Sequence, residues 1–259
     1  MKILTIVGSP RVNGNTHFLA HKFAEGANMG GAEEVEEVFL SKLNIHPCIA
    51  CYHCEKKDGV CTFNDDYPAI AEKMRASDGI LLASPVYGCC VTAQMKAFFD
   101  RGYAFSYPNW VTGLEKKYAA FIVTAGSPPP EKIEPWYEVY HHPTIEGMFR
   151  LSKDLKFADD RVTSIRDKID PKKYVDMTID TLRIMYQYCV FVRMGGVLGA
   201  LEVTGLGNNP KAVQGRPEDI QKAIEFGVQF AMMLKMIKEN GPLSSETPDP
   251  PSPLPEAMG

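Results

Sequence analysis

The 259-residue chain has little of what would mark a membrane or nucleic-acid-binding protein. It contains no apolar run of about 18 residues, so no membrane-spanning helix is expected. Its formal net charge is only −4, which makes it a poor candidate for binding nucleic acid or an anionic membrane. The apolar run near the N-terminus stops at Gly8, without the pattern of a secretory signal peptide. We therefore expect a cytoplasmic protein with no nucleic-acid or membrane partner.

Short β-rich apolar segments alternate with helical segments along most of the chain. Strands are predicted at about 2–8, 34–40, 79–84, 118–125 and 196–203. Helices are predicted to begin near Thr16, which can cap the first of them, at Asp65 or Asp66 and at Thr92, and to cover about 174–191 and 217–238. This alternation is typical of a doubly wound α/β fold, and five strands favour the flavodoxin-like parallel sheet with order 2-1-3-4-5.

Residues 1–241 are expected to form a single domain with two excursions. A cysteine-rich loop, 47–61, follows the second predicted strand, and an insertion, 128–173, follows the fourth. Insertions of this length are usually functional lids or interface elements, although a surface excursion with a small core of its own is the alternative. The tail, 242–259, contains six prolines and is predicted to be disordered.

Three polar loops follow predicted strands, at the edge where open α/β sheets bind ligands. The first, 9–16, has neither the Gly-Lys-Ser/Thr of a P-loop nor the GxGxxG of a dinucleotide site. It instead combines hydroxyl, guanidinium and amide groups with free N–H groups at a helix start, which are what a phosphate monoester needs. An ordinary capped turn is the alternative. The candidate residues are Ser9, Arg11, Asn13, Asn15 and Thr16.

The other two loops offer contacts for a flat ring. In the loop 84–88, Tyr87 can stack on a planar group, and Gly88 allows close approach of the backbone. The loop 124–127 ends the fourth predicted strand with Gly126 and Ser127. Each could be a simple turn when taken alone. Together with a phosphate-binding loop, they suggest a site for a mononucleotide with a flat ring.

Four of the seven cysteines lie within fourteen positions: Cys48, Cys51, Cys54 and Cys61. The two-residue spacers turn successive thiolates toward one centre, which suits a self-contained [4Fe–4S] cluster. Zinc is an alternative, with His53 as a further ligand, although structural zinc sites usually pair two separated Cys-x2-Cys knuckles. A set of thiols without metal is the other alternative.

The motifs GSPR-x-x-GNT at 8–16, Asp-Asp at 65–66, SPVYG at 84–88 and QMKAFFDR at 94–101 resemble the NADPH-dependent FMN reductase and flavodoxin-like family. The four-cysteine segment is similar to that of its iron–sulfur flavoprotein branch. The resemblance covers about residues 1–127 and, weakly, 196–238. Lys96, Asp100 and Arg101 match the family's helix signature and are interpreted as structural residues or as part of a subunit interface.

The resemblance implies specific roles for the candidate residues. Ser9, Arg11, Asn13, Asn15 and Thr16 would hold the phosphate of FMN. Pro85, Val86, Tyr87 and Gly88 would line the ribityl chain and isoalloxazine ring, which Ala125, Gly126 and Ser127 would approach from the fourth strand. Cys48, Cys51, Cys54 and Cys61 would hold a [4Fe–4S] cluster.

The expected function is that of an FMN-dependent iron–sulfur flavoprotein oxidoreductase, without catalytic side chains because the flavin carries the chemistry. It would move electrons between a two-electron donor or acceptor, such as NAD(P)H or a quinone, and a one-electron carrier such as ferredoxin. A homodimer or homotetramer is expected from the resemblance. The alternatives are a clusterless NAD(P)H-dependent FMN or quinone reductase, an electron-transfer flavoprotein with no substrate of its own, and a zinc-stabilised binding module.

Overall fold

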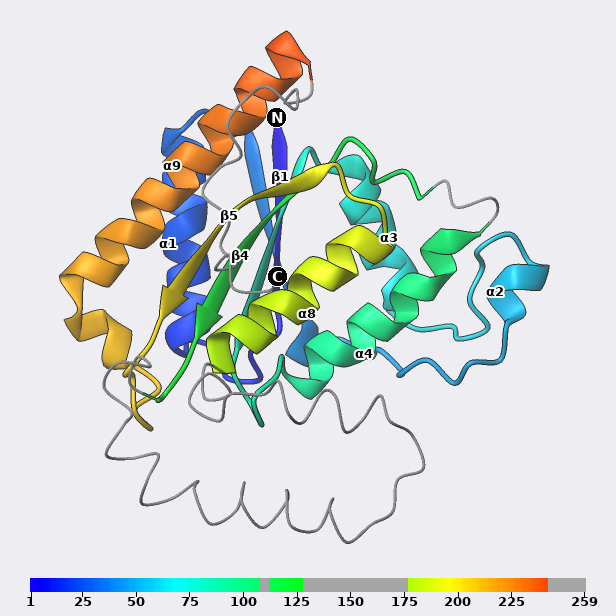
Figure 1. Cartoon of the computed structure of the whole chain (residues 1–259), viewed down its shortest axis with the longest axis horizontal. Coiled ribbons are helices and arrows are strands. Elements are labelled where there is room, and N and C mark those ends of the chain that lie inside the picture. The colour runs from blue at the N-terminus through cyan, green and yellow to red at the C-terminus, as the bar shows by residue number, and fades with distance from the viewer. Residues whose placement is uncertain (108–111, 128–176, 242–259) are drawn as a thin grey trace, which may run out of the picture.

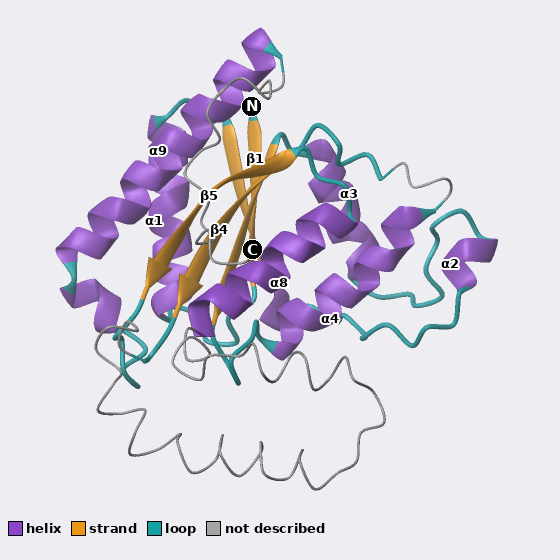
Figure 2. Ribbon diagram, in the orientation of Figure 1, coloured by secondary structure: helices purple, strands orange, loops and turns teal. Residues whose placement is uncertain are grey.

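The computed structural model describes residues 1–107, 112–127 and 177–241 (Figure 1). The predicted insertion, 128–173, and the predicted tail, 242–259, lie outside the described residues. In the described part, a central sheet carries helices on both faces (Figure 2). No helix in these three ranges is long and apolar enough to cross a membrane.

The sheet has five strands: β1 (Lys2–Val7), β2 (Glu34–Phe39), β3 (Gly79–Pro85), β4 (Tyr118–Thr124) and β5 (Gly196–Val203). Their order is β2-β1-β3-β4-β5, and every neighbouring pair is parallel. The predicted flavodoxin-like topology is therefore confirmed. The central strands β3 and β4 are buried along their whole length, which explains their continuous apolar sequences. The edge strand β2 instead carries three glutamates.

Two groups of helices cover the two faces of the sheet (Figure 1). The helices α1 (Asn15–Met29) and α9 (Pro217–Asn240) share one apolar core with the sheet. The other core is built with α3 (Tyr67–Ala76), α4 (Ala93–Arg101) and α8 (Met177–Phe191). The short helical segments are η1 (Leu40–Lys42), α2 (His53–Lys56), η2 (Gly102–Ser106) and η5 (Ala212–Gly215).

The predicted starts of α1, α3, α4 and α9 are correct to within two residues, but the expected cap of α1 is wrong. Thr92 does cap α4, since its hydroxyl accepts a hydrogen bond from the Met95 N–H. The cap of α1 is Gly14, and Thr16 lies inside the helix with its hydroxyl directed at Thr124. Asp66 precedes α3, yet its carboxylate accepts from the Asn44 N–H instead of capping the helix. Both side chains therefore bond to groups that are distant in the sequence instead of capping their helices.

Glycines allow α1 and α9 to cross with their backbones in close contact. A methyl group at Gly227 would lie 2.0 Å from the Phe23 carbonyl oxygen, and one at Gly26 would lie 2.0 Å from the Ile224 carbonyl oxygen. Neither neighbour is a flexible side chain, so the backbones would have to separate. This crossing holds the helix that follows the first polar loop against the sheet.

Gly227→Ala should therefore destabilise the protein, although alanine has the higher helix propensity. We expect the free energy of unfolding to fall by about 1–3 kcal/mol, the usual cost of overpacking. Gly215→Ala is the matched control, because a methyl group there would meet no atom within 4 Å. Urea unfolding of both variants checks this, and equal midpoints would contradict the close crossing.

Candidate functional site

A cleft lies at the carboxyl ends of the strands, bounded by the loops after β1, β3, β4 and β5. Nine of the predicted cofactor residues line it: Ser9, Arg11, Asn15, Thr16, Pro85, Val86, Tyr87, Ala125 and Gly126. Asn13, Gly88 and Ser127 do not belong to its lining. The structure thus brings the three predicted loops together, while their role in binding a cofactor stays a prediction.

The N-terminus of α1 opens at this cleft without a side-chain cap. Gly14 occupies the N-cap position and cannot offer a side-chain oxygen to the first-turn N–H groups. The buried Thr16 hydroxyl shares a hydrogen bond with the Thr124 hydroxyl, 2.7 Å away. Ser9 Oγ accepts from the Arg11 N–H at 3.2 Å and so shapes the loop. First-turn N–H groups and the exposed Arg11 are therefore suited to an anion.

The predicted residue Asn15 joins two loops through its side-chain amide. Its Nδ2 donates to the Asn209 carbonyl oxygen at 2.8 Å, and its Oδ1 accepts from the Val213 N–H at 3.1 Å. Both ends of the amide are thus engaged by the segment after β5. Asn15 therefore positions the wall of the cleft, and its contact with a phosphate stays a prediction.

The sequence interpretation missed that segment after β5. Leu206, Gly207 and Pro210 line the cleft, and Gly14 and Thr124 also belong to its lining. The signal was the Thr-Gly-Leu-Gly-Asn-Asn-Pro run at 204–210, a fourth polar loop that follows a strand. Gly126 allows this loop to approach, because a methyl group there would lie 2.8 Å from the Gly207 carbonyl oxygen.

A tight turn presents Tyr87 at the edge of the cleft. Tyr87 and Cys90 exchange two backbone hydrogen bonds of 2.9 and 3.1 Å. Gly88 and Cys89 between them both have positive φ, at 56° and 61°, as in a type I′ turn. Gly88 is therefore needed for the turn itself. The Tyr87 side chain remains 42% exposed, so its ring is available to a ligand.

The four clustered cysteines line a second cavity, which shares no residue with the cleft. Its wall also includes Asp100, Tyr103 and Phe63. The Ala50 N–H lies 3.4 Å from Cys48 Sγ, within the distance for a hydrogen bond to sulfur. Burial raises the pKa of the Cys54 thiol, and the nearby Cys61 and Cys48 act in the same direction. The loop thus places its four cysteine thiols around one cavity.

The positions of the four cysteine sulfurs can be compared with what different metal sites require. Within the described ranges, no three His, Cys, Asp or Glu side chains are close enough to hold one metal ion. A tetrahedral zinc site with Zn–S bonds of about 2.3 Å needs sulfurs about 4 Å apart. The described side chains therefore do not form a preassembled tetrahedral zinc site. Four thiols that line one cavity are also compatible with a polynuclear cluster, whose ligands bind different metal atoms.

A buried ion pair closes the cysteine loop at its base. Arg101 at the end of α4 donates from Nη1 and Nη2 to the two Asp65 oxygens, at 2.6 and 3.1 Å. The exposed fractions of the two side chains are 1% and 0%. The Arg101 guanidinium lies over the rings of Phe63 and Tyr67, at 5.2 and 4.7 Å. The interpretation of Arg101 as a structural residue agrees with these contacts.

The same ion pair joins the two chain segments that enter and leave the cysteine loop. Arg101 Nη1 also donates to the His46 carbonyl oxygen, and the His46 N–H donates to Asp65, each at 3.0 Å. Next to it, Asn44 and Asp66 exchange two hydrogen bonds, Asn44 N–H to the Asp66 carboxylate and Asp66 N–H to the Asn44 carbonyl. The positions flanking residues 47–64 are therefore joined.

These contacts determine the ionisation of Asp65. Burial by itself would raise the pKa of Asp65, but the hydrogen bonds from Arg101, His46 and Tyr67 outweigh it and hold the pKa below its usual value. A carboxylate with a depressed pKa stabilises the fold above its unfolded pKa of about 3.9. That contribution is lost as the pH falls toward the folded pKa.

With the geometry established, comparison with known proteins identifies the chain's family. Residues 1–129 match the family described as NADPH-dependent FMN reductase. In this N-terminal half, the chain belongs to that family. The matched residues include the three cleft loops that follow β1, β3 and β4. They also include the cysteine loop.

Two curated relatives are named iron–sulfur flavoproteins. The protein of Methanosarcina thermophila is 40% identical over 127 residues, which cover 49% of this chain and 64% of the relative. That of Methanocaldococcus jannaschii is 43% identical over 103 residues, covering 39% and 51%. This chain thus spans less than two thirds of the length of each of these two relatives.

Solved structures share the fold at low sequence identity. A flavone reductase aligns with a TM-score of 0.58 and 18% identity, covering 92% of this chain and 64% of its own. An NAD(P)H:quinone oxidoreductase of Methanothermobacter marburgensis aligns with a TM-score of 0.54 and 14% identity, covering 89% and 96%. These likenesses establish the fold alone.

Asp65→Asn should remove one charge of the buried pair and leave Arg101 uncompensated. We expect a loss of about 3–5 kcal/mol in the free energy of unfolding at pH 7, and a smaller difference from the wild type at pH 3, which lies below the unfolded pKa of Asp65, so that part of the carboxylate's contribution is lost. Glu72→Gln, which breaks an exposed pair with Arg75 on α3, should cost about 0–1 kcal/mol. Urea unfolding at both pH values checks this. A pH-independent difference would show that the charge of Asp65 is not what stabilises the loop.

Proposed function

We propose that the protein is an FMN-dependent iron–sulfur flavoprotein oxidoreductase. The observation that carries the proposal is the cleft, which joins an uncapped helix N-terminus, an exposed arginine and an exposed tyrosine ring at one sheet edge. A phosphate monoester attached to a flat ring system needs this combination of groups. The family of residues 1–129 and the names of the relatives support FMN as that ligand.

Each part of the cleft has its own task in this proposal. Arg11 and the first-turn N–H groups of α1 bind the phosphate, with Ser9 and Thr16 shaping the surrounding wall. Pro85, Val86 and Tyr87 line the ring and the ribityl chain. Ala125 and Gly126 approach the ring from the end of β4, beside the loop after β5.

The cysteine cavity would hold a [4Fe–4S] cluster through Cys48, Cys51, Cys54 and Cys61. The Ala50 N–H and the aromatic walls around Phe63 and Tyr103 would shield the sulfurs and adjust their electron density. The buried Arg101 keeps a fixed positive charge near this cavity, and, against the opposing effect of burial, the charge of Cys61 contributes to raising the pKa of Arg101. These residues fit a group of negatively charged thiolates.

When bound, FMN supplies two-electron chemistry that can be divided into single-electron steps, and an iron–sulfur cluster supplies one-electron transfer. The protein's own contribution is to bind, orient and shield, so no catalytic side chain is proposed. NAD(P)H or a quinone is the proposed two-electron partner, and a carrier such as ferredoxin the one-electron partner. The proposed assembly is a homodimer or homotetramer.

A clusterless NAD(P)H-dependent FMN or quinone reductase is the second candidate. It is favoured by the family match over residues 1–129, whose description names an FMN reductase. The two candidates differ in metal content and in partner. Anaerobic purification followed by iron and sulfide analysis, with NAD(P)H oxidation measured against a quinone and a one-electron acceptor, distinguishes them. Without NAD(P)H oxidation, the protein would instead be an electron carrier.

Arg11→Ala should weaken FMN binding by about 1.5–3 kcal/mol, the range for a hydrogen bond to a charged group. Arg11→Lys is the matched variant, because it keeps the charge and loses the planar fork, and we expect a smaller loss. Riboflavin, which has no phosphate, should bind all three proteins alike. Flavin fluorescence titrations measure the dissociation constants, and an unchanged FMN affinity in Arg11→Ala would show that Arg11 does not contact the phosphate.

Cys51→Ala should abolish iron and sulfide binding while FMN stays bound, because the cysteine cavity and the cleft share no residue. Cys89→Ala is the control, since Cys89 is exposed and lies outside the cysteine loop. The wild type and the control should each hold about four irons and four sulfides per chain. Retention of iron by Cys51→Ala would refute the ligand assignment. Flavin without iron in the wild type would favour the clusterless reductase.

A further inference from the structure

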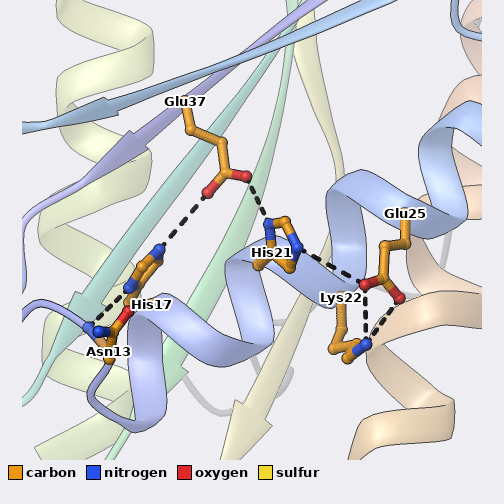
Figure 3. Close-up of polar contacts among 6 residues, drawn as sticks. All are labelled: Asn13, His17, His21, Lys22, Glu25 and Glu37. Carbon is orange, nitrogen blue, oxygen red and sulfur yellow. Dashed lines mark hydrogen bonds and ion pairs between the residues drawn. The ribbon is translucent and has the colours of Figure 1, made fainter.

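His17 on α1 contacts the loop after β1 through Asn13 and does not itself line the cleft. The turn from Arg11 to Gly14 is closed by a hydrogen bond of 3.1 Å from the Gly14 N–H to the Arg11 carbonyl oxygen. Asn13, its third residue, has φ of 64°, in the left-handed region that asparagine tolerates. The Asn13 N–H then points back to the helix and donates to His17 Nδ1 at 2.7 Å (Figure 3).

That contact determines the tautomer of His17. A backbone N–H can only donate, so Nδ1 must present its lone pair, and the ring proton resides on Nε2. Nε2 faces Glu37 Oε2 on β2 at 3.8 Å. This carboxylate oxygen is buried and accepts no hydrogen bond from the described residues. A proton on Nε2 is therefore favoured electrostatically, and the ring carries no net charge.

The surroundings keep His17 in this orientation. The side chain is only 16% exposed, and its ring meets the edge of Phe39 with centroids 4.4 Å apart. Burial lowers the pKa of His17, with His21 and Lys42 acting the same way and Glu37 opposing them. His21 Nδ1 holds the other Glu37 oxygen at 2.8 Å and so orients that carboxylate (Figure 3).

We propose that His17 is a positioning residue for phosphate binding. As the neutral tautomer, it holds the Arg11–Gly14 turn through Asn13, and this fixes the direction of Arg11 and the first-turn N–H groups at the cleft. The inference rests on the proposed function, since it assumes that the cleft binds FMN by its phosphate. It assigns the selectivity for FMN over riboflavin partly to a side chain that does not line the cleft.

The test compares FMN and riboflavin affinities of the flavin-free full-length protein at pH 7.5, by flavin fluorescence titration. His17→Phe keeps a ring but removes the acceptor, and His17→Asn keeps an acceptor near the position of Nδ1. We expect His17→Phe to lose about two- to tenfold in FMN affinity, the range for one neutral hydrogen bond, with riboflavin affinity unchanged. His17→Asn should restore most of the FMN affinity. If His17→Phe does not fold, His17→Leu takes its place.

His21→Phe is the matched control, because His21 lies one turn further along α1, is 55% exposed and shares Glu37 without touching the loop. It should leave both affinities unchanged. The wild type should also lose FMN affinity more steeply than His17→Asn as the pH falls below the ordinary pKa of histidine, because burial lowers the pKa of His17 and protonation of Nδ1 then removes the acceptor. The phosphate of FMN titrates in both proteins, so their difference reports His17.

Three outcomes would overturn the inference. An unchanged FMN affinity in His17→Phe would show that the contact with Asn13 does not matter for the phosphate. An equal loss for both flavins would show a general packing role. A wild-type protein that binds no FMN would overturn the proposed function together with this inference, whereas wild-type binding with no effect of His17→Phe overturns this inference alone.

Discussion

Parallel pairing of the five strands is the constraint on which the rest of the structure depends. Because all strands run in one direction, the loops after β1, β3, β4 and β5 must meet at one edge. No single loop there offers a complete binding site. The cleft arises because the uncapped end of α1, the Tyr87 turn and the glycines at 126 and 207 are brought together. The close crossing of α1 and α9 then holds the first of these loops in place.

The cysteine loop depends on a different kind of interaction. It lies at the right-hand edge of the molecule in Figure 1, around α2, away from the carboxyl ends of the strands. The large apolar side chains of this loop stay exposed, namely Ile49, Tyr52 and Val60. The base of the loop is instead held by a desolvated ion pair and four surrounding hydrogen bonds. Asp65 and Arg101 are far apart in the sequence, and each would be costly to bury alone. Their pairing fixes the loop that carries all four thiols to the end of α4.

Much of the fold could be predicted because local pattern and tertiary structure agree. The buried strands β3 and β4 have continuous apolar sequences, and α9 begins at a proline and ends before a glycine. Prediction failed where a side chain had a choice of partners. Thr16 and Asp66 suit a helix cap, yet a threonine on β4 and a backbone N–H from Asn44 compete for them. The loop after β5 was missed because glycines and asparagines mark a turn without showing what that turn faces.

The order of elements, the anion-suited composition of the first loop and the four-cysteine spacing could be read from the chain alone, since each depends on neighbouring residues. Only the tertiary structure decided that Asn15 clamps the loop after β5, that Arg101 closes the cysteine loop and that His17 holds Asn13 from behind. The physical reason is that a polar side chain specifies what it can bond to, whereas its actual partner depends on which groups the folded chain places within about 3 Å.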